Sequence, residues 1–273
     1  MVSTVCKIMK RSRQSYYKAL AGRTKQLADD KNLMSLVQPI RHIMPRLGGK
    51  KLHYMIADRL AENKQRMGRD RFFQWLKQHD LLIRPKKRYV YTTQSHHRFW
   101  VYNNLTENLS LTKPNQLWVS DITYLRTAEG FCYLALITDA YSRKIVGFDV
   151  SDSLELNGCV RALKSAIQTA SNLGQLIHHS DRGIQYCSDT YTNLLRDNGI
   201  RISMAAKGNC YENALAERVN GILKNEFNLD AEFRTKQHAF QAVKQTVYIY
   251  NTIRPHWSLN LKTPMQSHQI NKC

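Results

Sequence analysis

From residue 116 onward, short apolar runs alternate with longer amphipathic stretches, and this alternation constrains the fold more than any other feature of the sequence. Apolar runs bounded by turn residues predict strands, whereas apolar residues at three- and four-residue spacing predict helices. Three consecutive strands, followed by strands that alternate with helices, indicate an α/β fold with a mixed five-stranded sheet and flanking helices. The expected strands are residues 116–125, 131–138, 144–150, 175–179 and 200–204, and the expected helices are 156–173, 189–197, 211–227 and 231–251.

Three acidic residues lie at informative places in this pattern. Asp121 lies inside the first expected strand, Asp181 follows the fourth, and Glu217 lies on the helix after the fifth. A carboxylate in an apolar strand is costly to bury unless it is paired or bound to a metal. A set of oxygen ligands without cysteine favours Mg²⁺ or Mn²⁺ over zinc. Two such ions would polarise the attacking and leaving oxygens of a phosphodiester, which predicts a site that cuts or joins nucleic acid.

The charge of the chain indicates a polyanionic partner. The sequence has 41 lysine and arginine residues against 21 acidic residues, which gives a formal net charge of +20. Of this charge, +16 lies within residues 1–110. Such an excess is typical of proteins that bind nucleic acid and, less often, anionic membranes. No apolar run approaches the roughly 18 residues of a membrane span, no secretory signal is recognisable, and the six scattered cysteines indicate reduced thiols in the cytoplasm.

Residues 1–90 are expected to form a basic helical region. Leu52, Met55, Ile56 and Leu60 follow helical spacing, and a second helix is expected from about Gly68 to His79. Arg69 and Arg71 on this second helix would contact DNA if the pair is a helix-turn-helix. A basic helical hairpin that packs on the rest of the chain is the alternative.

Two further regions follow this basic region. Residues 91–114 are expected to be a basic linker, either one that stacks aromatic rings on bases or a solvated loop. Residues 115–273 are expected to be the catalytic domain with its C-terminal helices.

Five ordered blocks between about residues 45 and 266 resemble those of bacterial insertion-sequence transposases, of the DDE type related to retroviral integrases. The blocks begin at Trp118, Asp139, His179, Lys207 and Tyr250 and read WVSDITY, DAYSRKIVG, HSDRGIQY, KGNCYENA and YNTIRPHWSL. Thirty-five residues separate Asp181 from Glu217, which is the spacing of this family. The chain departs from the family pattern at Ala205 and Ala206, where Ser-Arg is common, and at Glu212, where Asp is frequent.

The resemblance implies an RNase H-like catalytic core and Mg²⁺- or Mn²⁺-dependent cleavage at the ends of a mobile element, with two ions in the site. The freed 3′-hydroxyl then attacks a second phosphodiester. Asp121, Asp181 and Glu217 carry over as catalytic residues and metal ligands. The implied partners are the element ends and the target DNA, further copies of the chain on that DNA, and a helix-turn-helix product of an upstream frame. No membrane partner is expected, and the protein is expected at the nucleoid.

Several residues are candidates for DNA contacts. Lys224 lies seven residues after Glu217 on the same helix face, where the family often has a basic residue, although a plain surface lysine is the alternative. His179 would touch the scissile phosphate or be a packed histidine. Arg254 would contact DNA or close the fold through a salt bridge. Lys207, in the fourth block, is a further candidate for a DNA contact.

Other acids compete with the proposed triad. Glu212 and Glu226 are the alternatives to Glu217 as the third acid of the site. Asp139 is expected to have a structural role and to fix the turn that contains Ser142 and Arg143. A Ser-His-Asp hydrolase is disfavoured because adjacent strand residues point to opposite faces of a sheet. Two other functions remain open, a non-catalytic DNA-binding regulator and a metal nuclease that only hydrolyses.

Overall fold

The computed structural model describes residues 2–63, 65–83, 100–107, 109–170, 172–205 and 214–269. The chain divides into two compact units, Met1–Pro85 and Lys86–Cys273. The expected end of the basic region, residue 90, lies among residues 84–99, which are outside the described residues.

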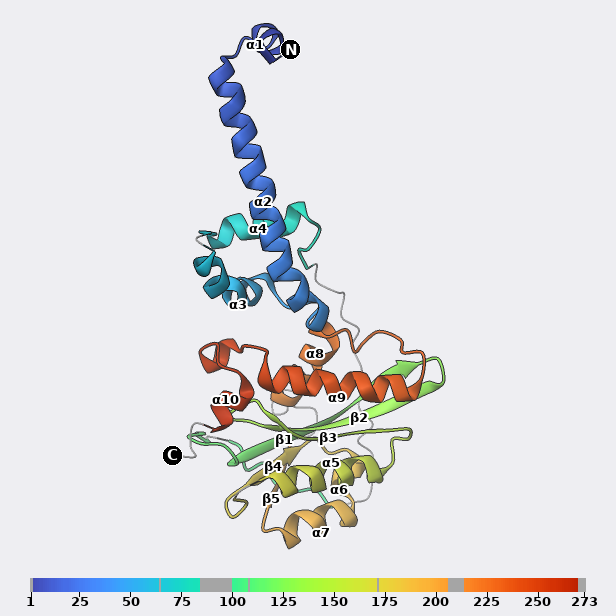
Figure 1. Ribbon diagram of the computed structural model, residues 1–273. Coiled ribbons are helices and arrows are strands. Elements are labelled where there is room, and N and C mark those ends of the chain that lie inside the picture. Colours follow the sequence, from blue (N-terminus) through green and yellow to red (C-terminus); the bar gives the residue numbers. More distant parts are fainter. Residues whose placement is uncertain are drawn as a thin grey trace. The chain divides into compact units, whose positions relative to one another are not determined.

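The first unit consists of the helices α1 (Val2–Ile8), α2 (Arg13–Ile43), α3 (Gly49–Glu62) and α4 (Arg69–Gln78) (Figure 1). Apart from Cys6 on α1, its buried side chains come from the C-terminal half of α2 and from α3, α4 and the loop between α2 and α3. They include Leu33, Val37, Met44, Leu47, Leu52, Ile56, Phe72 and Leu76. The Trp75 indole donates a hydrogen bond from Nε1 to Asp30 Oδ1 over 3.1 Å, which ties α4 to α2.

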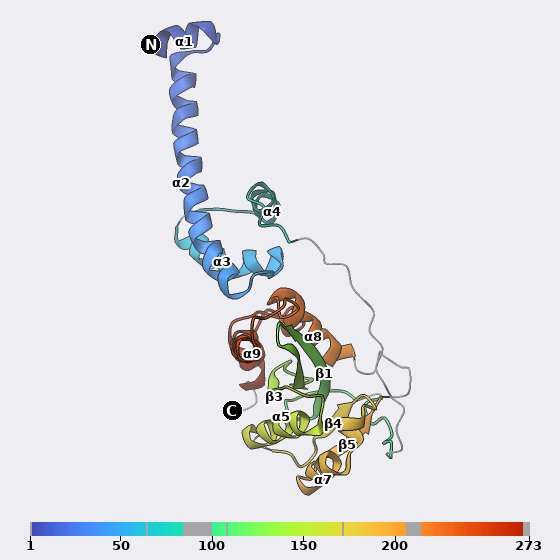
Figure 2. The same ribbon diagram turned by 90° about the vertical axis from the view of Figure 1, so that its right-hand side faces the viewer.

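The helices α3 and α4 lie close to where the sequence predicted them, but the 31-residue helix α2 was not predicted as one element. The described side chains of residues 13–28 are exposed, including those of Tyr16, Tyr17, Leu20 and Leu27, so this half of α2 contributes no buried side chain to the core of the unit. Figures 1 and 2 both show this half projecting beyond α3 and α4.

The second unit contains a five-stranded sheet with the order β3-β2-β1-β4-β5. Its strands are β1 (Leu117–Thr127), β2 (Gly130–Asp139), β3 (Ile145–Ser151), β4 (Ile177–Ser180) and β5 (Arg201–Met204). The first three strands are antiparallel neighbours, and β4 and β5 are parallel to β1 and to each other. The predicted mixed sheet is confirmed, with β1 as its middle strand.

The central strand β1 is paired unequally on its two sides. It pairs with β2 over ten residue pairs, from Trp118↔Asp139 to Thr127↔Gly130. It pairs with β4 only at Leu117, Trp118 and Val119. Among the described residues, the edge of β1 beyond Val119 that faces away from β2 pairs with no further strand and makes one isolated parallel bridge, between Thr127 and Phe233.

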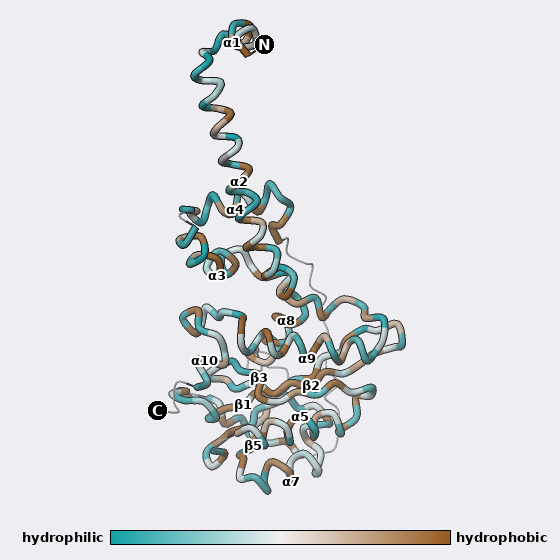
Figure 3. The backbone as a smooth tube through the Cα atoms, viewed as in Figure 1, coloured by the Kyte–Doolittle hydropathy of each residue, from teal (hydrophilic) through white to brown (hydrophobic). Residues whose placement is uncertain are grey.

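Helices cover both faces of the sheet (Figures 1 and 2). The helices α5 (Leu156–Thr169), α6 (Ile184–Cys187) and α7 (Asp189–Asp197) lie on one face, and α8 (Ala214–Glu226), α9 (Lys236–Thr252) and α10 (Pro264–Gln269) lie on the other. Figure 3 shows hydrophobic residues concentrated along the strands between these layers. The helix-α5 face contributes a core that includes Trp118, Ile137, Leu163, Leu176, Tyr191 and Leu195.

A close approach between β3 and α5 requires glycine. A Cβ atom at Gly147 would lie 2.3 Å from the Ala162 carbonyl oxygen, so no side chain fits there. The described part of the segment expected to be a linker also packs on this unit, since Val101 and Tyr102 contact the core and the Leu105 amide donates to Ser203 Oγ over 2.9 Å. No helix in the described ranges is long and apolar enough to cross a membrane.

Candidate active site

The topology places Asp121 and Asp181 next to each other. Val119 of β1 pairs with His179 of β4 in parallel register. Asp121 and Asp181 each lie two residues beyond that pair, at the point where β4 ends and β1 continues. Parallel neighbours lie about 4.8 Å apart, so the two carboxylates leave the sheet side by side. Glu217 lies in the first turn of α8, the helix that packs against β1.

The electrostatics of Asp121 show that the three carboxylates act on one another. The pKa of Asp121 is raised to about 7, mainly by burial, then by the negative charge of Asp181 and, to a smaller extent, by that of Glu217. The hydrogen bonds from Asn220 and from the Ile122 amide act in the opposite direction. A divalent cation beside Asp121 would relieve this repulsion, because an opposite charge favours the ionised carboxylate.

Asn220 is a site residue that the sequence analysis missed. It lies three residues after Glu217 on α8, its side chain is buried, and its Nδ2 donates to Asp121 Oδ2 over 2.7 Å. Its Oδ1 is buried without a hydrogen-bond partner among the residues that the structure describes. Its position among the apolar residues of the buried face of α8 was the signal in the sequence that pointed to it.

The turn after β4 holds Asp181 in place. Asp181 Oδ1 accepts a hydrogen bond from the Gly183 amide over 2.9 Å. The Arg182 guanidinium donates from Nε to the Ala205 carbonyl over 2.8 Å, which joins this turn to the end of β5. The Asp-Arg-Gly sequence is therefore a fixed turn that presents the carboxylate.

The donor set suits a hard cation, but the three carboxylates do not form a closed metal site. Within the described ranges, no three His, Cys, Asp or Glu side chains come together closely enough to hold a metal ion. Asp121 is half-buried, whereas Glu217 is exposed on the first turn of α8. The metal-binding role predicted for Asp121, Asp181 and Glu217 therefore stays a prediction.

Lys224 lies over the ring of Tyr124. Its Nζ atom is 4.3 Å from the ring centroid, within the range of a cation–π contact. Burial lowers the pKa of Lys224, and the charges of Asp121 and Asp230 oppose that effect. The lysine is therefore close enough to the site to sense Asp121.

Two of the residues predicted to contact DNA are buried. His179 is fully buried, and its Nδ1 lies 2.8 Å from Ser203 Oγ, so it is a packed histidine. Arg254 is only 2% exposed and donates to both carboxylate oxygens of Glu226, over 2.7 and 2.8 Å. Arg254 therefore closes the fold rather than contacting DNA, and Glu226 is engaged in this pair rather than in the site.

The remaining predicted residues lie elsewhere. Arg69 and Arg71 are exposed on α4 in the first unit, where Arg69 Nε donates to Asp70 Oδ1 over 2.9 Å. Lys207 and Glu212 lie outside the described residues. The structural role of Asp139 is confirmed, because its buried Oδ1 accepts from the amide and hydroxyl of Ser142 over 2.7 and 2.6 Å. The Arg143 amide donates to the Asp139 backbone carbonyl over 2.9 Å.

Two family models match the second unit. Both are described as "Integrase core domain", and they match residues 112–210 and 198–264. The chain is also 35% identical over 266 residues to the "Insertion element IS600 uncharacterized 31 kDa protein" of Shigella sonnei, covering 95% of this chain and 96% of that protein. The chain belongs to the insertion-sequence transposases with an integrase core domain.

The chain is also similar to a relative that is named a transposase. The transposase of insertion sequence element IS904 from Lactococcus lactis is 35% identical over 193 residues, which cover 67% of this chain and 76% of that protein. Among solved structures, the HTLV-2 integrase catalytic core domain in complex with magnesium is 21% identical. It aligns with 57% of this chain and 97% of that domain, with a TM-score of 0.45.

Proposed function

We propose that this protein is a DDE transposase that catalyses metal-dependent cleavage and strand transfer at the ends of a mobile element. The observation that carries the proposal is that Asp121 and Asp181 each lie two residues beyond the last β1–β4 pair, and that the charges of Asp181 and Glu217 both act on the Asp121 carboxylate. Membership of the insertion-sequence transposases supports DNA as the substrate.

Each side chain of the site has a separate task in this proposal. Asp121, Asp181 and Glu217 would hold Mg²⁺ or Mn²⁺, and two such ions, when bound, would stabilise the attacking and leaving oxygens of a phosphodiester. Asn220 fixes one oxygen of Asp121, so that the carboxylate has a defined orientation. Lys224 supplies a positive charge for a DNA phosphate next to the carboxylates.

The basic residues outside the site would hold the DNA through contacts with its phosphates. Residues 1–110 carry the charge excess, and Arg69 and Arg71 are exposed there, while Lys207 precedes α8. Such binding weakens steeply with salt, because counterions are released from the DNA. Joining two ends would require at least two copies of the chain on the DNA, with a helix-turn-helix product of an upstream frame as the further partner. A protein with this function acts at the bacterial nucleoid.

The test is an assay of the full chain on DNA that carries the ends of its own element, with Mg²⁺ or Mn²⁺, alone and with the upstream-frame product. We expect joined strands from the wild type and from Asp197→Asn, an exposed carboxylate at the end of α7 that serves as a control. Asp181→Asn is expected to abolish nicks and joined products while DNA binding persists. Nicks without joining would favour a nuclease, and binding without cleavage would favour a regulator.

A further inference from the structure

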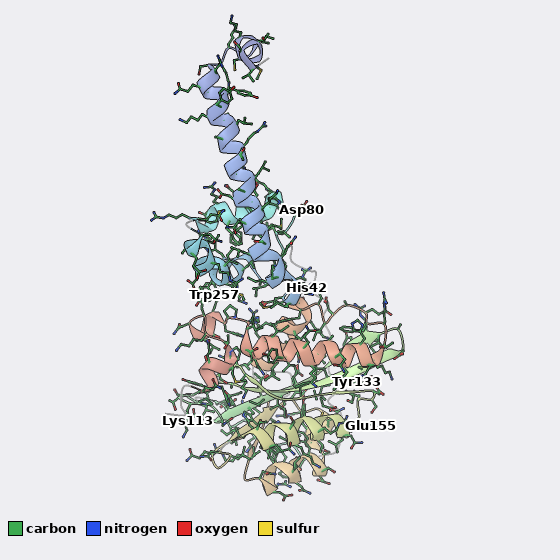
Figure 4. The ribbon with its side chains drawn as sticks, viewed as in Figure 1. His42, Asp80, Lys113, Tyr133, Glu155 and Trp257 are labelled. Atoms are coloured by element: carbon green, nitrogen blue, oxygen red, sulfur yellow. The ribbon has the colours of Figure 1, made fainter. Side chains whose placement is uncertain are left out.

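The five-stranded sheet consists of two parts, and each part carries one aspartate of the candidate site. The strands β3, β2 and β1 form an antiparallel part. In it β1 and β2 share ten residue pairs, and Tyr133 of β2, labelled in Figure 4, pairs with Tyr124 of β1 and Ser151 of β3. The strands β4 and β5 form a parallel part with four residue pairs. Asp121 lies in the antiparallel part and Asp181 directly follows β4, so the separation of the two carboxylates depends on how β1 is joined to β4.

The joint between β1 and β4 is short. The two strands pair at three positions, of which the last is Val119↔His179. Beyond that pair, Ser120 and Asp121 make no backbone pair with β4 in the part of the chain that the structure describes. Parallel pairs are also slightly less stable per residue than antiparallel pairs. Side chains at the end of the joint are therefore needed to hold β1 and β4 at a fixed separation.

A buried side-chain hydrogen bond crosses the joint at this point. His178 Nε2 of β4 lies 2.6 Å from Ser120 Oγ of β1 and 3.0 Å from the hydroxyl oxygen of Tyr191 on α7. All three side chains are buried. The contact with Ser120 links the two strands one residue before Asp121, whereas the contact with Tyr191 links β4 to a covering helix.

These three side chains act on the site by position rather than by charge. The pKa of His178 is lowered to about 3, mainly by burial, so its ring is neutral near neutral pH. Successive strand residues point to opposite faces of a sheet, so Ser120 points away from the face on which Asp121 meets Asn220. The network therefore lies across the sheet from a cation that the carboxylates would hold, and it reaches them through the backbone of the two strands.

We propose that Ser120 and His178 are positioning residues, whose hydrogen bond fixes the separation of the two aspartates and thereby the affinity of the site for a divalent cation. This inference rests on the proposed function and adds two residues to its machinery. Without the bond, three backbone pairs would hold the joint, and the carboxylates would sample a wider range of separations. Mg²⁺ requires nearly ideal octahedral geometry, so its binding is sensitive to such a change.

The first measurement is Mn²⁺ binding by the full chain, followed through the electron paramagnetic resonance signal of free Mn²⁺. Ser120→Ala removes the hydroxyl that links the strands. Tyr191→Phe removes the second hydroxyl that contacts His178 but leaves that link in place, so it is the matched control. Both variants are expected to unfold at a lower temperature than the wild type. Ser120→Ala alone is expected to weaken Mn²⁺ binding, by roughly tenfold, as is usual when a residue that orients a metal ligand is lost.

The second measurement is the Mg²⁺ concentration needed for half-maximal joining of DNA ends, which should rise in Ser120→Ala and not in Tyr191→Phe. His178→Phe keeps a ring without its hydrogen bonds, is expected to behave like Ser120→Ala, and replaces it if that variant does not fold. A folded variant of Ser120 or His178 with wild-type Mn²⁺ affinity, or an equal loss of affinity in Tyr191→Phe, would overturn the positioning role. A wild type that binds no more Mn²⁺ than Asp181→Asn and joins no DNA ends would instead overturn the proposed function.

Discussion

Asn220 donates a hydrogen bond to Asp121 over 2.7 Å, although the two residues are 99 positions apart in the sequence. The bond joins α8 to β1 at the carboxylate that the charges of Asp181 and Glu217 both affect. Because Glu217 lies one helical turn before Asn220, the same contact fixes the part of α8 that carries the third acid.

Asn220→Ala is expected to raise the Mg²⁺ concentration needed for half-maximal joining several-fold, because Asp121 loses the donor that orients it. The cost in stability should be about 1–3 kcal/mol, the usual cost of a lost buried hydrogen bond. Titrating Mg²⁺ in the joining assay, together with thermal unfolding, checks both effects. Asn225→Ala, an exposed asparagine of the same helix, is the control. An unchanged Mg²⁺ requirement would mean that Asn220 only packs.

Asp121→Asn is expected to stabilise the metal-free protein at neutral pH. The folded state raises the pKa of Asp121 from its ordinary value of 3.8 to about 7, so it favours the protonated carboxyl. Near pH 4, the wild type and the variant should therefore be similar in stability. As the pH rises from 4 to 7, the unfolded wild type ionises more readily than the folded protein, and the wild type loses stability.

Thermal unfolding in the presence of a chelator, measured from pH 4 to pH 8, tests this dependence. The melting temperature of Asp121→Asn should exceed that of the wild type by several degrees at pH 7. Above pH 7 this difference should stay constant. Added Mg²⁺ should reduce the difference. A difference in melting temperature that is the same from pH 4 to pH 8 would show that the pKa of Asp121 is not raised in the folded protein.

Arg254→Ala is expected to destabilise the protein by roughly 3–5 kcal/mol, since it leaves the Glu226 carboxylate without its partner in a largely buried place. The paired replacement Arg254→Met with Glu226→Leu should recover much of this loss. The salt dependence of DNA binding should not change, because Arg254 is buried. A folded Arg254→Ala protein with normal stability and a weaker salt dependence would instead place Arg254 on the DNA.

Asn251 of α9 is expected to be needed for the start of β3. Its side chain donates to the Ile145 carbonyl and accepts from the Ile145 amide, each over 3.0 Å, as a neighbouring strand would. Asn251→Asp keeps the acceptor and loses the donor, so it should unfold at a lower temperature than the wild type. Faster hydrogen exchange at the Ile145 amide in Asn251→Ala would locate the effect, and unchanged exchange there would refute it.

Much of the second unit could be predicted from local patterns. The apolar runs of β1 and β2 are buried on both faces of the sheet, so their composition alone indicated strands. The proximity of Asp121 and Asp181 followed from the position of Asp121 inside the central strand and of Asp181 directly after the fourth strand. The first half of α2 was not predicted as one helix, because its few apolar residues stand among polar ones and pack into no core.

The sequence also did not predict which polar side chains contact one another. Arg254 and Glu226 are 28 positions apart, and the sequence shows both charges but not that α8 and the end of α9 bring them together. The same holds for Lys224 and Tyr124, whose contact depends on the direction in which α8 crosses β1. Such contacts depend on how helices and strands pack against one another, and the periodicity of the sequence does not predict this packing.

The most direct test of the central claim is a single-turnover joining assay with DNA ends that already carry a free 3′-hydroxyl, in Mg²⁺. Wild-type protein is compared with Asp121→Asn, Asp181→Asn and Glu217→Gln, and DNA binding is measured in parallel. We predict that each variant binds the ends normally and loses joining by at least a thousandfold. Joining at the wild-type rate by any one of the three would contradict the account.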